Sequence, residues 1–215
     1  MINIGDSSSL FSSHFTATFV GIEELLPNEK LLTTNFAEKR IKDFSTGRYC
    51  ARKAMEHIGY ESSEILMGAN KQPVWPNGLV GSISHTVALT GAIVGFSSQI
   101  KAIGLDIENI GKINSDMWPL LYTENEQIFL NSLPPGQVSV YTTLFFSFKE
   151  SFYKMQYPLT NTFLEFNDVE ISGLGDQFTI KVLKQFPEKN LLPSTTTVLH
   201  HQLENNHIIT WCYIV

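Results

Sequence analysis

Two helical patterns, each followed by a group of short strand-like runs, limit the fold of this chain more than any other feature. The first pattern repeats apolar residues on one helical face from Phe36 to Gly59. The second lies in "VYTTLFFSFKESFYKMQY" and is expected to end before Pro158. The strand-like runs are "SISHT", "ALTGAIVGF" and "KAIGLDIENI" after the first helix, and "FLEFNDVEIS", "QFTIKVLKQF", "TTTVLHHQL" and "HIITWCYIV" after the second. This order predicts an α+β protein with two similar halves, residues 1–110 and 111–215.

Composition excludes several classes of function. The 215 residues carry a formal net charge of -6, whereas a protein that binds duplex nucleic acid is usually basic. The two cysteines, Cys50 and Cys212, lie far apart and match neither a zinc motif nor a disulfide framework. The N-terminal residues lack the pattern of a signal peptide, and no run is long and apolar enough to cross a membrane. The expected partners therefore include no nucleic acid and no integral membrane segment, and the expected compartment is a reducing cytoplasm.

Two acidic residues stand two apart inside an apolar run, "AIGLDIENI". In a strand, Asp106 and Glu108 would project from the same face, with Gly104 leaving space beside them. Paired carboxylates repel one another unless a proton or cation intervenes, and oxygen ligands of this kind suit Mg²⁺. An edge strand whose solvent face carries two acids explains the same letters, and this pattern alone favours that simpler reading.

The second helix carries a charged pair opposite its apolar side. Glu150 and Lys154 are four residues apart and share one helical face. They form either an ordinary exposed ion pair or a third metal ligand beside a phosphate-binding lysine, and helical geometry does not separate these readings. Shortly before this helix, Thr123 and Glu126 have the spacing of a capping box. The apolar arc comprises Leu144, Phe145, Phe148, Phe152 and Met155.

Four segments occur in one order: "GRYCARKA" from Gly47, "WPNGLVGSISHT" from Trp75, "IGLDIE" from Ile103 and "FSFKESFYK" from Phe146. Together they resemble the 4′-phosphopantetheinyl transferase superfamily, of the enterobactin-synthase component D and surfactin-synthetase type, across about residues 36 to 155. The family pattern is a WP-x-G…S-x-SH block, then G-x-D-x-E, then (F/W)-x-x-KE-x-x-x-K. Phe148 departs from the small residue usual before Lys-Glu, and we interpret it as a packing variation.

The resemblance implies a fold and a reaction. The fold would be a pseudo-twofold α+β monomer, in which each half is a small, mainly antiparallel sheet packed on a long helix and the active site lies between the halves. The reaction would transfer 4′-phosphopantetheine from coenzyme A to a serine hydroxyl of an apo acyl or peptidyl carrier protein, releasing adenosine 3′,5′-bisphosphate. Siderophore or other nonribosomal peptide or polyketide synthesis is the context that the resemblance favours. A non-catalytic coenzyme A-binding module of the same fold is the alternative.

The resemblance also implies roles for individual residues. Asp106, Glu108 and Glu150 would bind Mg²⁺, with Mn²⁺ as a possible substitute. Asp106, Glu150 and Lys154 would be catalytic, and either Glu150 or a metal-bound water would take the serine proton. For each basic residue the alternative is a solvated helix face, and for His85 a histidine at a strand end. The residues implied to bind coenzyme A are Arg40, Arg48, Lys71, Ser84, His85, Lys149 and Lys154.

One further implication concerns the carrier protein. Gln127 and Phe129, on the short helix after Thr123, are placed on the carrier-docking surface by analogy of position alone. Because the chain is acidic overall, we expect a local basic or apolar patch to dock an acidic carrier.

Overall fold

The computed structural model describes residue 2, residue 4 and residues 10–185 and 197–215. Contacts within the chain divide it into two units, Met1–Ile103 and Gly104–Val215. In the described part of the chain, no helix combines the length and the apolar character that crossing a membrane requires.

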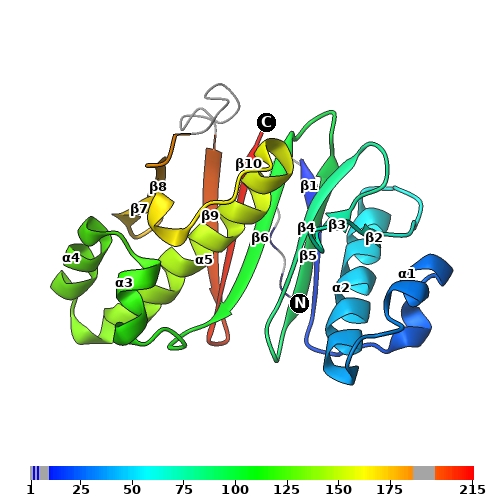
Figure 1. Ribbon diagram of the computed structural model, residues 1–215, viewed down its shortest axis with the longest axis horizontal. Coiled ribbons are helices and arrows are strands. Elements are labelled where there is room, and N and C mark those ends of the chain that lie inside the picture. The colour runs from blue at the N-terminus through cyan, green and yellow to red at the C-terminus, as the bar shows by residue number, and fades with distance from the viewer. Residues whose placement is uncertain (1, 3, 5–9, 186–196) are drawn as a thin grey trace. The chain divides into compact units, whose positions relative to one another are not determined.

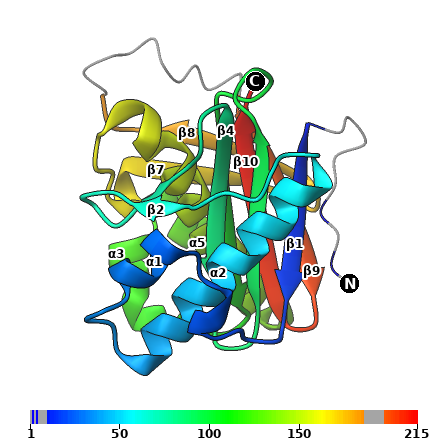
Figure 2. The same ribbon diagram turned by 90° about the vertical axis from the view of Figure 1, so that its right-hand side faces the viewer.

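The first unit is a three-stranded antiparallel sheet with one long helix packed on it. Its central strand is β5 (Thr90–Phe96), which pairs with β1 (Phe11–Thr16) on one side and β4 (Leu79–His85) on the other. The long helix α2 (Glu38–His57) lies across these strands (Figure 2). The small elements of this unit are η1 (Ile22–Glu24), α1 (Pro27–Leu32), β2 (Leu66–Met67) and β3 (Pro73–Val74).

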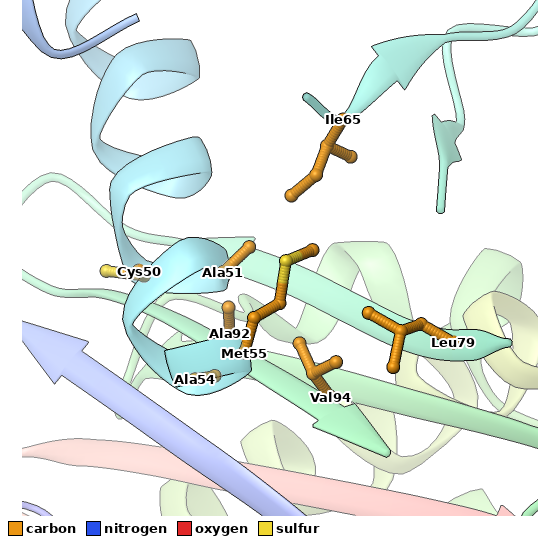
Figure 3. Packing of buried hydrophobic residues seen from close by; sticks show 8 residues of the cluster. All are labelled: Cys50, Ala51, Ala54, Met55, Ile65, Leu79, Ala92 and Val94. Atoms are coloured by element: carbon orange, nitrogen blue, oxygen red, sulfur yellow. The ribbon is translucent and has the colours of Figure 1, made fainter. Parts of the chain in front are cut away.

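The core of the first unit forms where α2 meets its sheet. Ala51, Ala54 and Met55 on α2 face Ala92 and Val94 on β5, and all of them are buried (Figure 3). Alanines on the helix allow this close approach, and Gly47 on the same helix lies against the side chain of Ile83. Burial of these apolar side chains is the main term that holds the helix on the sheet.

The second unit has the same plan. Its central strand β10 (His207–Ile214) lies between β6 (Ala102–Asn109) and β9 (Thr197–Glu204), and the long helix α5 (Pro135–Thr160) packs on β10 (Figure 1). The β9–β10 hairpin turns at Asn205-Asn206, both of which have positive φ, as a type I′ turn requires. The remaining elements are η2 (Ser115–Met117), α3 (Trp118–Leu121), α4 (Glu124–Ser132), η3 (Phe166–Asp168), β7 (Val169–Leu174) and β8 (Gln177–Val182).

Each unit, taken by itself, has the same order of elements: a strand, a short helix, a long helix, a small two-stranded ribbon and two further strands. In both sheets the last strand lies in the centre and the first strand lies beside it. This gives the mixed α/β fold with small antiparallel sheets that the sequence predicts. The predicted twofold relation concerns how the units are placed and stays a prediction.

The division between the units falls earlier than the predicted boundary at residue 110. The reason is that β6 pairs with β10, so Asp106 and Glu108 belong to the second unit. The third strand of the first sheet is instead β1, which is not predicted from the sequence.

Two details of the second half also differ from the expectations. The helix does not stop before Pro158 but continues to Thr160, where Asn161 adopts the left-handed conformation and ends it. Pro135 occupies the first turn of α5, where its missing N–H costs nothing. Of the predicted strand at residues 163–172, residues 163–165 have no regular structure and 166–168 form η3, so the strand begins only at Val169. Phe186 and Thr195-Thr196, at the ends of two predicted strands, lie outside the described residues.

Candidate active site

Gly104 allows the backbone of α5 to lie directly against β6. A Cβ built on Gly104 would stand 1.9 Å from the carbonyl oxygen of Ser151 and 2.9 Å from the amide nitrogen of Met155. The space that the sequence predicts beside the carboxylates is therefore filled by the helix. Because helix and strand meet this closely, side chains of α5 reach the face of β6 that carries Asp106.

Asp106 is buried, at 3% exposed, and both of its carboxylate oxygens accept hydrogen bonds from α5. Lys154 donates to Oδ1 over 2.7 Å and Ser147 donates to Oδ2 over 2.9 Å. Lys154 also donates to the backbone oxygen of Leu105 over 3.1 Å. β6 does lie at the edge of its sheet, but the simpler reading, two acids on a solvent face, is wrong for Asp106.

Glu108 and Glu150 are partly buried, and the charge of Asp106 acts on both of them. Burial raises the pKa of Glu108, and the charge of Asp106 raises it further. Burial likewise raises the pKa of Glu150, followed by Asp106, while Lys154 lowers it and Glu108 contributes a smaller increase. The structure thus brings together three carboxyl groups and one ammonium group from β6 and α5, and Lys154 lies 48 residues from Asp106 in the chain.

The donor set fits a hard divalent cation, although its present arrangement is not a formed metal site. Carboxylate oxygens are the ligands that Mg²⁺ prefers, and a cation would offset the repulsion between these carboxylates. Among the described residues, however, no group of three His, Cys, Asp or Glu side chains stands in a metal-binding arrangement. In this structure Lys154 supplies the positive charge beside Asp106.

Glu150 lines a half-open cavity of about 140 Å³ between α5 and the segment that leads to β7. The surrounding side chains are mostly aromatic and apolar, among them Phe152, Tyr153, Phe163 and Phe166. Glu150 is therefore accessible from a cavity, whereas Asp106 is covered.

Lys149 does not take the predicted place at a phosphate-binding surface. Its side chain is 2% exposed, and Nζ donates to Glu126 Oε2 over 2.6 Å, to Leu121 O over 2.8 Å and to Phe166 O over 2.9 Å. An ammonium group has three protons, so these three acceptors satisfy it. The helical step of about 100° per residue points Lys149 in a different direction from Glu150, towards α4 and Phe166, although both residues line the cavity. In this structure Lys149 therefore joins α5 to Leu121, Glu126 and Phe166, and its predicted contact with coenzyme A stays a prediction.

The remaining candidates belong to the first unit, and Arg48 is the most constrained of them. Its Nε donates to Ile65 O over 2.9 Å, Nη2 donates to Leu66 O over 3.3 Å, and the guanidinium stands 4.1 Å from the centre of the Phe44 ring. Burial is the main cause that lowers the pKa of Arg48 to about 10. Arg48 therefore anchors α2 to residues 65–66, and little of it is exposed to a ligand.

Arg40, Lys71 and His85 are exposed, as phosphate-binding residues would be. Arg40 stacks on Phe36 at 4.8 Å, and His85 Nδ1 lies 3.9 Å from Asp43 on α2. Ser84, in contrast, is buried. Because Ile83 packs against the helix side of the sheet, alternation along β4 places Ser84 on the opposite face, away from Asp43.

Three buried polar residues at this site were not predicted as functional: Ser147, Thr210 and Glu126. Ser147 lies inside the segment "FSFKE", but a single serine in a helix gives no signal of its own. Glu126 was recognised only as a cap of α4, which the structure confirms: Thr123 accepts from the Glu126 backbone N–H, and Glu126 accepts from that of Thr123. Its second role, as the partner of Lys149, depends on tertiary contacts.

Comparison with known proteins gives two family matches, one in each unit of the chain. Residues 28–95 match the family model of the 4′-phosphopantetheinyl transferase N-terminal domain, and residues 102–212 match that of the 4′-phosphopantetheinyl transferase superfamily. The chain is 31% identical over 191 residues to the 4′-phosphopantetheinyl transferase PptT of Mycobacterium tuberculosis, covering 86% of this chain and 84% of that one. It is 32% identical over 166 residues to the 4′-phosphopantetheinyl transferase Svp of Streptomyces mobaraensis, covering 76% and 68%.

More partial similarities extend this group. Enterobactin synthase component D of Salmonella typhimurium is 36% identical over 139 residues, covering 63% of this chain and 56% of that one. Among solved structures, the holo-[acyl-carrier-protein] synthase of Thermotoga maritima covers 54% of this chain and 63% of that one, at 15% identity and a TM-score of 0.43, a likeness too weak to inform the fold.

Proposed function

The chain belongs to the 4′-phosphopantetheinyl transferase superfamily, and from this premise we propose that it transfers 4′-phosphopantetheine from coenzyme A to a serine hydroxyl of an apo carrier protein. The observation that carries the proposal is the convergence of Asp106, Glu150 and Lys154 from β6 and α5. The residue types suit the reaction, because a pyrophosphate needs cations and a serine nucleophile needs a base.

Within this proposal, Asp106, Glu108 and Glu150 hold a divalent cation, for which Mg²⁺ is the candidate and Mn²⁺ the substitute. Such a cation would neutralise charge on the pyrophosphate as the P–O bond breaks. Lys154 already lies beside Asp106, at 2.7 Å, and would stabilise negative charge on the leaving phosphate. Glu150 is accessible from the cavity and is the candidate base for the serine proton.

We propose that Arg40, Lys71 and His85 contact the adenosine-side phosphates of coenzyme A, because their charged groups are exposed. Arg48 and Ser84 are buried in this structure, and their contacts with coenzyme A stay predictions. Carrier docking through Gln127 and Phe129, the monomeric state and the cytoplasmic location stay predictions. The similarity to enterobactin synthase component D supports a siderophore or other nonribosomal peptide pathway as the context.

The test is incubation of the full chain with coenzyme A, Mg²⁺ and a panel of apo carrier proteins, read by intact mass. We expect addition of one phosphopantetheine per carrier. Asp106→Ala should lower the rate about 10³-fold, because loss of a metal ligand forfeits several kcal/mol of charge stabilisation and 1.36 kcal/mol is a factor of ten.

Asp116→Ala, which removes an exposed acid from η2, is the matched control and should keep full activity. Binding of coenzyme A by calorimetry without labelling of any carrier would instead identify a non-catalytic coenzyme A-binding module. An Asp106→Ala variant as active as wild type would contradict the proposed site.

A further inference from the structure

A chain of buried hydroxyl groups leads from β10 through α5 to the carboxylate of Asp106. Thr210 Oγ1 donates to the backbone oxygen of Ser147 over 2.8 Å and lies 2.8 Å from Ser147 Oγ. Ser147 Oγ donates to Asp106 Oδ2 over 2.9 Å. Ser147 and Thr210 are 0% exposed and Asp106 is 3% exposed, so water does not compete for these bonds.

The number of protons fixes the direction of this chain. Each hydroxyl has a single proton, and a carboxylate only accepts. Ser147 therefore gives its proton to Asp106, and Thr210 shares its single proton between the backbone oxygen and the Oγ of Ser147. Both oxygens of Asp106 are then oriented from α5, one by the buried Ser147 and the other by the partly exposed Lys154.

The first unit offers an internal comparison at the matching helix position. Ser147 precedes Lys149 by two residues, as Cys50 precedes Arg52, and Lys149 and Arg52 are each the buried base that pairs with a glutamate of the preceding short helix. The Cys50 thiol donates a long 3.7 Å bond to Thr90 O. Thr90 Oγ1 has no hydrogen-bond partner among the residues that the structure describes.

We propose that Ser147, oriented by Thr210, is the positioning residue that fixes the carboxylate of Asp106 for a divalent cation. This inference rests on the proposed function, in which Asp106 is a metal ligand. Partners that hold a ligating carboxylate in place raise the affinity of a site for its metal, and their loss typically costs 10–100-fold in affinity or activity. Lys154 cannot replace Ser147 in this role, because a divalent cation would compete with the Lys154 ammonium group for the Asp106 carboxylate.

The experiment measures Mn²⁺ binding to the full chain by electron paramagnetic resonance, alongside melting temperature and the rate of carrier modification. Ser147→Ala should weaken Mn²⁺ binding about 10–100-fold. Ser147→Cys, which introduces the residue of the first unit with little change in volume, should give a smaller loss because a thiol is a weak donor. Thr210→Val should lie nearest to wild type, because Ser147 keeps its proton for Asp106.

Thr90→Val in the first unit is the control, because it removes a buried threonine hydroxyl that binds no carboxylate among the described residues. It should leave Mn²⁺ affinity unchanged, whatever it does to the melting temperature. Folded Ser147→Ala and Ser147→Cys proteins that bind Mn²⁺ within twofold of wild type would overturn the inference alone. If the wild-type chain neither binds Mn²⁺ nor modifies a carrier, the inference falls together with the proposed function.

Discussion

The two units fasten their long helices with the same arrangement of side chains. In the first unit, Glu29 on α1 accepts from Arg52 on α2 and from the backbone N–H groups of Leu26 and Ile65. In the second, Glu126 on α4 accepts from Lys149 on α5 and from the backbone N–H groups of Thr123 and Ile171. Each glutamate is separated from its basic partner by 23 residues.

The likeness extends to the neighbouring residues. Asn28, just before Glu29, binds Glu64, just before Ile65, and Asn125, just before Glu126, binds Glu170, just before Ile171. One buried carboxylate in each unit thus joins a short helix, a long helix and a strand or loop. The difference lies on the long helix: the residue after Arg52 is the surface residue Lys53, whereas the residue after Lys149 is Glu150. The comparison indicates that both units share one frame, meaning the buried glutamate, its basic partner on the long helix and the neighbouring Asn–Glu pair. The proposed chemistry is an addition in the second unit.

Breaking the two ion pairs is the strongest test of this likeness. Glu29→Ala and Glu126→Ala should each lower the free energy of unfolding by about 3–5 kcal/mol, because each leaves a buried positive charge unpaired. Urea denaturation measures the loss. Only Glu126→Ala should also reduce carrier modification strongly at temperatures where the protein remains folded, because Lys149 holds the segment of α5 that carries Glu150.

Glu124→Ala, an exposed acid on the same helix as Glu126, serves as the control and should change stability little. An equal loss of activity in the folded Glu29→Ala and Glu126→Ala proteins would contradict the division of roles between the units.

The sequence predicts one of these two frames better than the other. Thr123 and Glu126 have capping-box spacing, so the helix start at Glu124 is visible locally. Glu29 follows Leu26 and Pro27, which give no such signal, and α1 was not predicted. Neither ion pair can be predicted from the sequence, because a spacing of 23 residues has meaning only after the short and long helices have packed together.

The candidate site is likewise only partly predictable from the sequence. The family motif points to Asp106, Glu150 and Lys154, and in the structure α5 places Lys154 beside Asp106 on β6. The burial of Arg48 and Lys149 is not predicted from the sequence. Helical periodicity tells which face of the helix a side chain lies on, but not which other elements pack against that face. The paired letters Asn-Glu and Glu-Ile, at 28–29 with 64–65 and at 125–126 with 170–171, are the one internal signal that a search for repeats could have used.

Two glycines at helix–strand contacts give a second test of the comparison. A Cβ at Gly104 would stand 1.9 Å from a backbone oxygen of α5, whereas a Cβ at Gly47 would stand 2.8 Å from the Cγ2 atom of Ile83. Gly104→Ala should therefore lower the free energy of unfolding by about 1–3 kcal/mol or more, because backbone cannot move aside cheaply. Gly47→Ala should cost less, since a side-chain methyl can shift and alanine favours a helix by up to about 1 kcal/mol. Equal losses in urea denaturation would show that the two contacts are equally rigid.

The smallest expected effect concerns the exposed pair of the first unit. The side-chain and backbone N–H groups of Asn28 donate to Glu64 and lower the pKa of its carboxyl group. A carboxyl group with a lowered pKa in the folded state stabilises the protein above its unfolded pKa, and this contribution disappears as pH falls through the folded value. Asn28→Ala removes the first of these donors, so the pKa of Glu64 should rise towards that of an ordinary glutamate, as measured by NMR titration. Asn125→Ala, the matched change in the second unit, should leave the titration of Glu64 unchanged. A Glu64 pKa unaltered by Asn28→Ala would mean that the backbone N–H alone holds the carboxylate, and the likeness between the two frames would then stop at the buried glutamates.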